Sequence, residues 1–266
     1  MSLKDKSSLL CIVTGGSKGF GRAISLEVCK EWGVNRRIQK IVLVLVARDK
    51  MTLENTAAEC KSIYNDVTLY LLSHDLSDHD SILTLIEELN ALFCHGKEQF
   101  TEVMLFANAG RVGDVSKPIS SHFDPKILQK YFNLMLTSNI LISSWFTSEL
   151  KSVKKTIIFV SSLLAIQPYA GFSLYSAGKA GGHMLFRCMA EENPEVRVLV
   201  YSPGPLQTDM TDDVLKNMCF KKTQERFTQM KFLKPEFSVS ILFGILKDDK
   251  YKSGEYIDIY DIIKQE

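Results

Sequence analysis

The most restrictive feature of the sequence is an unbroken apolar run from Ile41 to Ala47, which opens with six consecutive isoleucine, valine or leucine residues. A strand of this composition has apolar side chains on both faces, so other elements must cover it above and below. The run is far shorter than the roughly 20 residues that cross a membrane. It therefore predicts a central strand of a parallel sheet flanked by helices.

Other short β-rich runs alternate with segments of helical period along the chain. The strand candidates are Leu9–Thr14, Lys40–Ala47, Thr68–Ser73, Glu102–Phe106, Lys155–Ser161, Val196–Ser202 and Glu255–Ile259. The helix candidates are Gly19–Trp32, Met51–Asn65, Ser81–Phe93, Pro125–Leu150 and Tyr175–Ala190. Alternating strands and helices imply right-handed crossovers. We therefore expect an α/β fold, a single doubly wound Rossmann-type parallel sheet with helices on both faces.

No linker rich in proline, glycine or serine divides the chain, and we find no internal repeat, so residues 1–266 are expected to form one domain. The stretch from about Pro205 to Pro235 interrupts the alternation, being polar with scattered methionine and phenylalanine. It predicts a helical excursion over the top of the sheet, covering the substrate. Whether it is a lid or a surface helix pair stays open at this point.

The charge balance argues against a polyanionic partner. The chain has 32 Lys+Arg and 31 Asp+Glu, whereas nucleic acids and anionic membranes attract basic surfaces. The start of the chain has no apolar signal segment, and the six cysteines form no C-x-x-C pair, which favours reduced thiols and a cytoplasmic location. The five histidines have no metal-ligand spacing, and G-x-S-x-G is absent, so we expect neither a metal site nor a serine hydrolase.

A glycine-rich turn follows the first predicted strand and opens the first predicted helix. It comprises Gly15, Gly16, Ser17, Lys18, Gly19, Phe20 and Gly21. Glycines let a phosphate approach the main chain, and a helix N-terminus offers unpaired N–H groups and partial positive charge. An ordinary glycine-rich loop is the alternative, but the strand–turn–helix context favours a dinucleotide.

The second predicted strand ends at Arg48 and Asp49, where NAD-binding sheets usually place an acid for the ribose hydroxyls. The Arg48 guanidinium can pair with a 2′-phosphate, and Lys18 could add a second positive charge. Both favour NADPH/NADP+ as cofactor. Two alternatives remain: the two cations could be solvated surface charges, and Asp49 could take the ribose.

Tyr175 and Lys179 lie four residues apart at the start of a predicted helix, on one helical face. An ammonium near the phenol, helped by a cationic nicotinamide, favours the phenolate and lowers the tyrosine pKa. Tyr175 can then act as general acid for a carbonyl. Ser162 follows a strand at the sheet edge where α/β folds bind ligands, and its hydroxyl can stabilise charge on that oxygen.

Together, Thr14-Gly15-x-x-x-Gly19-x-Gly21, Asn108-Ala109-Gly110, Ser162 and Tyr175-x-x-x-Lys179 resemble the short-chain dehydrogenase/reductase family over nearly the whole chain. The resemblance implies that Tyr175 donates the proton, that Lys179 binds the nicotinamide ribose and lowers the tyrosine pKa, and that Ser162 orients the substrate. It adds cofactor contacts at Asp75, Leu76, Asn108, Leu206, Thr208, Asp209 and Met210.

A narrower similarity is to the sepiapterin reductases within that family. It extends over Leu163-x-Ala165-x-Gln167-Pro168, Pro203-Gly204-Pro205-Leu206-x-Thr208-Asp209-Met210, and the tail, where Lys252-Ser253-Gly254 precedes Asp258-x-Tyr260-Asp261. It implies reduction of pterin side-chain carbonyls, as in sepiapterin and 6-pyruvoyl-tetrahydropterin, in tetrahydrobiopterin formation. The implied substrate contacts are Ser162, Leu163, Tyr175, Gly204 and Asp258.

In that similarity Asp258 accepts two hydrogen bonds from the amino-pyrimidine edge of the pterin. From the residues alone, a strand-end aspartate that caps a turn is the favoured interpretation of Asp258, and the resemblance reverses that preference. Two other functions remain open: a broad-specificity carbonyl and diketone reductase, and a catalytically weak NADPH-binding sensor.

The chain departs from the family at Met135. The family usually has an asparagine there, in a proton relay through water, and neither Asn133 nor Asn139 matches its register. A methionine cannot hold a water in this way, so proton resupply would take another route or turnover would be slow. The helix from Leu134 to Leu150 is apolar all round, and the resemblance implies a homodimer through such helices.

Overall fold

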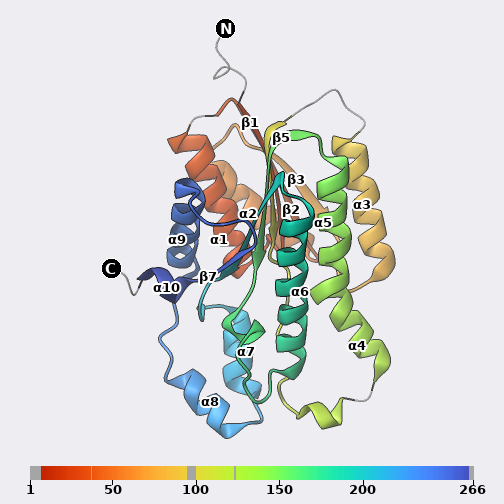
Figure 1. Ribbon diagram of the computed structural model, residues 1–266, viewed down its shortest axis with the longest axis vertical. Helices are drawn as coiled ribbons and strands as arrows, with labels where there is room; N and C mark the ends of the chain where they lie inside the picture. Colours follow the sequence, from red (N-terminus) through yellow and green to blue (C-terminus); the bar gives the residue numbers. More distant parts are fainter. Residues whose placement is uncertain (1–6, 37, 95–99, 123, 264–266) are drawn as a thin grey trace.

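The computed structural model describes residues 7–36, 38–94, 100–122 and 124–263, and a seven-stranded sheet forms its centre (Figure 1). The strands are β1 (Ser8–Thr14), β2 (Lys40–Ala47), β3 (Thr68–Ser73), β4 (Phe100–Ala107), β5 (Ser152–Val160), β6 (Val196–Ser202) and β7 (Glu255–Asp258). They pair in the order β3-β2-β1-β4-β5-β6-β7, and every pairing is parallel. The expected doubly wound α/β sheet is confirmed.

The apolar run from Ile41 to Ala47 lies in β2 and is buried from Ile41 to Val46. It lies between β1 and β3, with Ile12 opposite Val44 in the β1 register. Burial on both faces explains why the sequence shows no polar alternation here.

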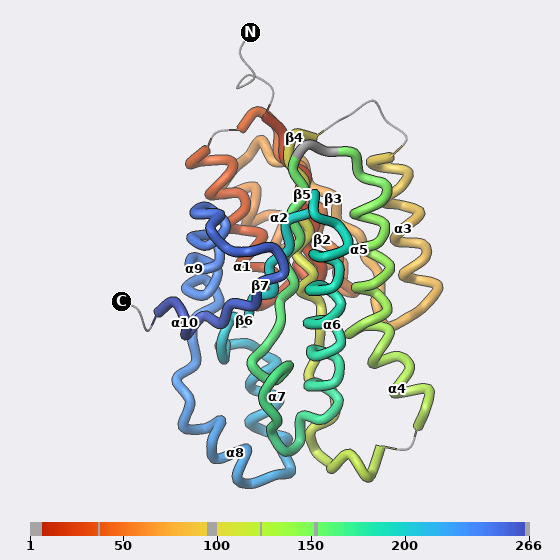
Figure 2. The backbone as a smooth tube through the Cα atoms, in the orientation of Figure 1, coloured from red at the N-terminus to blue at the C-terminus, as the bar shows by residue number. Residues whose placement is uncertain are grey.

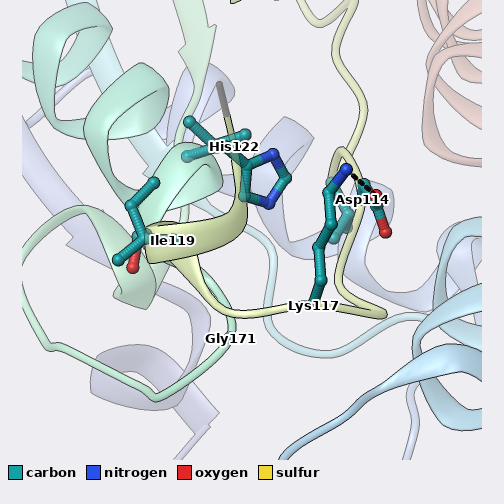
Figure 3. A pocket seen from close by; sticks show the side chains of 8 residues that line it. Asp114, Lys117, Ile119, His122 and Gly171 are labelled. Atoms are coloured by element: carbon teal, nitrogen blue, oxygen red, sulfur yellow. Dashed lines mark ion pairs between the residues drawn. The ribbon is translucent and has the colours of Figure 1, made fainter. Parts of the chain in front are cut away.

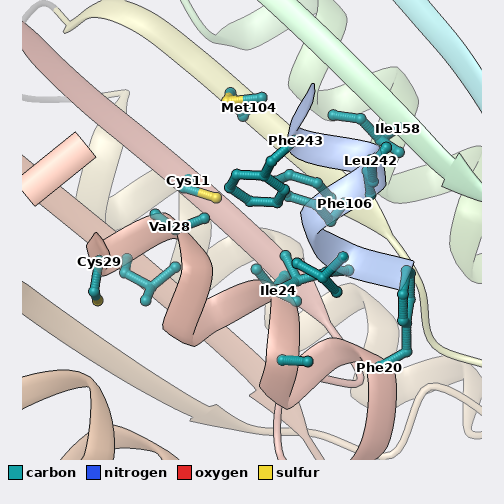
Figure 4. Packing of buried hydrophobic residues seen from close by; sticks show 14 of the residues in the cluster. Cys11, Phe20, Ile24, Val28, Cys29, Met104, Phe106, Ile158, Leu242 and Phe243 are labelled. Carbon is teal, nitrogen blue, oxygen red and sulfur yellow. The ribbon is translucent and has the colours of Figure 1, made fainter. Parts of the chain in front are cut away.

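One face of the sheet is covered by α1 (Gly19–Val28), the π-helix η2 (Cys29–Asn35), α2 (Lys50–Ile63) and α9 (Pro235–Asp248). In the core beneath them, the Phe243 ring of α9 stacks on Phe106 of β4 at a centroid distance of 6.0 Å (Figure 4). The edge of the same Phe243 ring contacts Trp32 at 5.6 Å. The aromatic contacts fix α9 against η2 and the sheet.

The other face carries α3 (His79–Phe93), α5 (Ser138–Glu149) and α6 (Ser173–Glu192). Phe159 of β5 and Phe186 of α6 stack at 4.8 Å. A Cβ on Gly182 would lie 2.4 Å from the Phe159 ring, so only glycine lets α6 approach the sheet this closely. The catalytic candidates on α6 are positioned by this contact.

The expected helix from Pro125 to Leu150 is interrupted: α4 (Pro125–Phe132) leads into the π-helix η4 (Asn133–Thr137) before α5 begins. Two side chains bond to main-chain carbonyls at this point, because Asn139 Nδ2 donates to Met135 O at 2.9 Å and Ser138 Oγ donates to Leu134 O at 2.8 Å. Such bonds draw carbonyls away from regular helical pairing. The expected first helix likewise continues into η2 instead of ending as one α-helix.

Four short or late elements were not expected from the sequence: α9, the 3₁₀ helices η3 (Ile119–Ser121) and η5 (Leu163–Ala165), and α10 (Ile259–Ile263). In the excursion between Pro205 and Pro235 the chain forms α7 (Asp209–Asn217) and α8 (Lys221–Thr228). Figure 2 shows both helices at the lower end of the molecule, beyond the sheet. Among the described residues, none of the helices has both the length and the apolar character of a membrane span.

Candidate active site

The glycine turn has the backbone that a phosphate cradle needs. Gly15 and Gly19 have φ angles of +68° and +51°, a region that favours glycine. A Cβ on Gly21 would lie 2.1 Å from Gly15 O, so the first turn of α1 packs directly on the loop. The glycine turn therefore packs tightly against the α1 N-terminus, whose N–H groups can bind an anion.

Asn108, just past β4, ties this turn to the sheet. Its Nδ2 donates to Thr14 O at 2.8 Å, while the N–H groups of Asn108 and Ala109 both donate to Thr14 Oγ1 at 3.0 Å. A Cβ on Gly15 would lie 2.8 Å from that Nδ2. The residues present thus form a rigid cradle that fits a dinucleotide pyrophosphate.

The remaining residues of the glycine turn either hold its main chain in place or lie on the protein surface. Ser17 O accepts a hydrogen bond from Thr56 Oγ1, a bond that does not involve the Ser17 hydroxyl. The Phe20 ring is buried and stacks on Tyr201, so Phe20 can meet a ligand only through main-chain atoms. Gly16 is held by its N–H bond to Val46 O. The Lys18 ammonium is exposed and lies 3.7 Å from the Asp209 carboxylate.

At the end of β2, Arg48 is exposed and Asp49 caps α2, accepting from the Thr52 N–H at 2.7 Å. That main-chain hydrogen bond lowers the pKa of Asp49. The carboxylate that could have taken a ribose is thus engaged locally. Arg48 forms no ion pair among the described residues, so its guanidinium is available for a 2′-phosphate.

Asp75 and Leu76 follow β3 on the same edge. Burial raises the pKa of Asp75, but two hydrogen bonds from Ser77 and the positive charges of Arg48 and Arg111 outweigh it, so the pKa lies below its ordinary value. Leu76 is buried. Their contact with the adenine, which the resemblance implies, stays a prediction.

The residues after β6 close the cradle from the opposite side. Thr208 begins α7, and its Cγ2 would be 3.2 Å from a Cβ on Gly19. Leu206 is buried and forms an isolated parallel bridge with Leu233. Asp209 reaches Lys18, as given above, and Met210 is partly exposed beside it. The excursion therefore lies directly against the glycine turn.

Tyr175, Lys179 and Ser162 are brought together by α6 and the end of β5. Lys179 is 5% exposed, and its Nζ donates to Val160 O at 2.7 Å and lies 5.9 Å from the centre of the Tyr175 ring. Ser162 is the residue before η5, where its Oγ accepts from the Leu164 N–H.

Burial dominates the electrostatics at Tyr175. Burial raises the pKa of Tyr175 to about 12, and a hydrogen bond with Ser162 only partly opposes it. Burial also lowers the pKa of Lys179 to about 8. In the protein alone, desolvation thus dominates the pKa of both groups, and the fall expected for Tyr175 beside a cationic nicotinamide stays a prediction.

An apolar cluster beside Tyr175 was not identified from the sequence. Phe172 contacts the Tyr175 ring at 6.1 Å on one side and stacks on Phe227 of α8 at 5.2 Å. Met218, at the end of α7, would touch a Cβ on Gly171 at 2.5 Å. The excursion is therefore packed onto the catalytic residues by aromatic contacts. The only sequence signal was its scattered phenylalanine and methionine.

Asp258 ends β7, directly beside Ser202 of β6. It is 7% exposed; Oδ1 accepts from the Tyr260 N–H at 3.0 Å and Oδ2 accepts from the Tyr256 hydroxyl at 3.3 Å. Asp258 therefore does cap the turn into α10. A carboxylate offers about four acceptor positions, so a ligand can still bond to it.

Two further predicted substrate contacts, Leu163 and Gly204, lie near the same edge. Leu163 is exposed at the start of η5. Gly204 has a φ of +75°, and a Cβ there would lie 3.0 Å from Ile259. This close contact joins the β6 end to α10.

Met135 is buried against the catalytic helix. A Cβ on Gly178 would lie 2.9 Å from the Met135 side chain, and a Cβ on Gly110 would lie 3.3 Å from its sulfur and 3.5 Å from Lys179 Nζ. The thioether thus borders the ammonium on the η4 side.

A shallow pocket opens near the candidate site, between the loop after β4 and the start of α6 (Figure 3). Its lining includes Asp114 and Lys117, which form an ion pair at 3.2 Å, and Ile119, His122 and Gly171. It includes none of the three catalytic candidates. Because Gly171 adjoins Phe172, the pocket lies on the outer side of the apolar cluster.

Comparison with known proteins agrees with this geometry. Residues 10–218 match the family model described as short chain dehydrogenase. A sepiapterin reductase of Bos taurus is 33% identical, covering 95% of this chain and 94% of that protein. A benzil reductase ((S)-benzoin forming) of Bacillus subtilis (strain 168) is 27% identical, covering 95% and 98%. The solved structure of KRED1-Pglu, at 24% identity, superposes with a TM-score of 0.76 over 93% and 99% of the two chains.

Proposed function

Because the chain belongs to the short-chain dehydrogenase family and is an NADP-dependent oxidoreductase acting on C=O and CH–OH groups, we propose that it reduces side-chain ketones of pterins, such as sepiapterin and 6-pyruvoyl-tetrahydropterin, in tetrahydrobiopterin formation. The observation that carries this proposal is the position of Asp258. It is a buried carboxylate at the same sheet edge as Ser162 and Tyr175.

NADPH, when bound, supplies the hydride for the carbonyl carbon. The cradle from Gly15 to Gly21 would hold its pyrophosphate, and Arg48 its 2′-phosphate. Arg48 and the helix N-terminus bind by charge, so their contribution weakens as salt rises.

The chain's own residues handle the carbonyl oxygen. The Ser162 hydroxyl donates a hydrogen bond that stabilises the developing charge, and the Tyr175 phenol gives its proton to the oxygen. The high pKa of Tyr175 keeps the phenol protonated before reaction. The Lys179 ammonium then stabilises the phenolate that remains.

Asp258 would orient the pterin. Its free acceptor positions match the N3–H and 2-amino donors of the ring, and the bonds to Tyr256 and Tyr260 hold the carboxylate still. Holding the ring at one end fixes the ketone at the other end.

A second candidate, a broad diketone reductase, is favoured by the apolar cluster. The Phe172–Phe227 stack beside Tyr175 gives an apolar surrounding suited to an aromatic diketone and independent of Asp258, and a benzil reductase is among the relatives. A catalytically weak NADPH sensor is the third candidate, suggested by Met135, but the complete set of Ser162, Tyr175 and Lys179 argues against it.

Turnover of sepiapterin and benzil by two variants separates the two reductase functions. Asp258→Asn keeps an oxygen for the Tyr260 N–H but loses the charge, so we expect sepiapterin kcat/KM to fall about 10- to 100-fold while benzil reduction is unchanged. Asp261→Asn, an exposed neighbour in α10, serves as the matched control. Equal loss on both substrates, or no loss, would refute the pterin anchor.

Tyr175→Phe tests the shared chemistry. Removing the proton donor is expected to slow reduction of every carbonyl by about 100-fold or more, with the Kd for NADPH unchanged. Undiminished NADPH oxidation would contradict the role of Tyr175 in both reductase functions. Tight NADPH binding by the unaltered protein with no carbonyl reduced would instead support the sensor.

A further inference from the structure

Three polar side-chain atoms lie buried behind the catalytic residues without a hydrogen-bond partner among the described residues. They are Ser161 Oγ, Ser202 Oγ and His183 Nδ1, on side chains that are 2%, 1% and 5% exposed. Buried polar atoms in native proteins nearly always bond to protein or to ordered water. Three such atoms in one region therefore indicate a site with a polar occupant.

The sheet register places the two serines side by side. The Ser161 N–H donates to Tyr201 O at 2.7 Å, so the β5–β6 ladder continues by one residue and sets Ser161 beside Ser202. Phe159 and Val200, two residues earlier on each strand, belong to the core under α6. Because side chains alternate along a strand, both serines face α6.

Helix α6 and β7 enclose the same space. The His183 ring lies 5.0 Å from the Tyr256 ring, and the Tyr256 hydroxyl donates to Asp258. A side-chain hydrogen bond with Ser202 lowers the pKa of that tyrosine, although burial raises it to about 12 overall; the contact is too poorly aligned to satisfy Ser202 Oγ. The region between α6 and the ends of β5–β7 is thus polar on its sheet side and its helix side.

Lys179 adjoins this space. It lies one turn before His183 on α6, and its Nζ donates to Val160 O, the carbonyl directly before Ser161. An ammonium has two further N–H donors beyond that bond. Toward η4, by contrast, the Met135 thioether borders Lys179, and Met135 O is already engaged by Asn139.

We propose that Ser161, Ser202 and His183 hold buried water, and that this water returns protons to Lys179 after each reduction. The inference rests on the proposed carbonyl reductase function but not on the choice of substrate. It provides a proton route to Lys179 on the sheet side, whereas the Met135 thioether cannot hold a water on the η4 side.

The proton transfers balance without any change of oxidation state. Tyr175 gives its proton to the substrate oxygen, and the phenolate takes one from the Lys179 ammonium. The Lys179 amine takes a proton from the adjoining water as that water takes one from the next, and the last comes from solvent. A lysine pKa near 8 lets the group both release and regain a proton near neutral pH.

A crystal structure of the protein with NADP+, at a resolution that shows ordered water, tests the site without any substrate. We expect a water within hydrogen-bond distance of Ser202 Oγ and of His183 Nδ1, and its displacement in Ser202→Val. Absence of water from the space between α6 and the β5–β7 ends would overturn the proposal, whatever carbonyl the protein reduces.

Rapid mixing tests the proton route with whichever carbonyl the unaltered protein reduces. The first turnover uses the proton already on Tyr175, so Ser161→Ala/Ser202→Ala should keep a normal first turnover and then slow by up to about 100-fold. Ser143→Ala is the matched control, since Ser143 is equally buried but its hydroxyl bonds to Asn139 O within α5.

Two results would overturn the proton role. Equal slowing of the first and later turnovers indicates a structural effect of the lost hydroxyls. Unchanged rates in every turnover show that protons reach Lys179 by another path. Thermal melting of the double variant beside Ser143→Ala confirms that both proteins are folded.

Discussion

At the residue scale, the sequence identified the side chains of the candidate site but not the effect of burial on their pKa values. Tyr175, Lys179 and Ser162 were found from spacing and strand ends, because helical period and sheet topology fix where such residues meet. Burial raises the pKa of Tyr175 in the protein alone, an effect that spacing does not encode, and the fall expected with a bound nicotinamide stays a prediction. Likewise, the capping role of Asp258 depends on α10, which no sequence pattern predicted.

Lys179 gives a prediction about stability and pH. Its pKa is about 8 in the folded protein against an ordinary 10.5, so between these values the unfolded chain binds more protons. Stability therefore rises with pH across this window. The unfolding free energy of the unaltered protein minus that of Lys179→Met should increase by up to about 3 kcal/mol from pH 8 to 10.5.

Denaturant unfolding of both proteins at several pH values measures this difference. Subtracting the variant removes the contributions of buried tyrosines and cysteines, whose pKa values are raised. A difference that stays flat with pH would show that Lys179 is not desolvated.

At the element scale, the strands were predicted more accurately than the helices. The bounds of β2, β3 and β6 agree with the expected ranges, since each is a mostly apolar run that stops at polar or turn residues. The long helix was expected to be continuous, but η4 interrupts it. That break comes from Asn139 and Ser138 bonding to carbonyls, contacts that hydrophobic period does not encode. Helix α9 was missed although Pro235 marks its first turn.

The junction of β2 and α2 yields the prediction at this scale. Asp49 caps α2, so Asp49→Ala should lower the melting temperature and leave the Kd for NADPH unchanged. Arg48→Ala should instead weaken NADPH about 10- to 100-fold, by losing charge-assisted bonds to the phosphate, with little effect on NADH. Titration calorimetry and thermal melting measure both. Weaker NADH binding by Asp49→Ala would show that Asp49 contacts the ribose.

At the scale of the whole molecule, three regions of the chain serve different tasks at one edge of the sheet. The β1–β4 half forms the cofactor cradle, β5 and α6 carry the proton donor, and the excursion with β7 surrounds the substrate side. Topology could be predicted because alternation of strands and helices leaves few parallel arrangements. The packing of α7 and α8 onto Phe172 could not, since it depends on contacts far apart in sequence.

We propose that the protein is a homodimer through α5 and α6. Their outer faces expose Ile140 and Met184, which are 41% and 54% exposed, an apolar surface that a second copy can cover. Light scattering should show a dimer, and Ile140→Asp/Met184→Asp should shift it to monomer. Met51→Asp, on the opposite face, is the matched control. An unaltered protein that is monomeric at micromolar concentration would refute this assembly.

The short edge strand β7 has one further consequence. It is held to the sheet by only four paired residues of β6, while the proton donor sits on a twenty-residue helix. Edges of this kind open before interiors do. Moderate warming should therefore lower the substrate specificity of the protein before it abolishes activity. Small ketones would still be reduced at temperatures at which a large ring is no longer held in place.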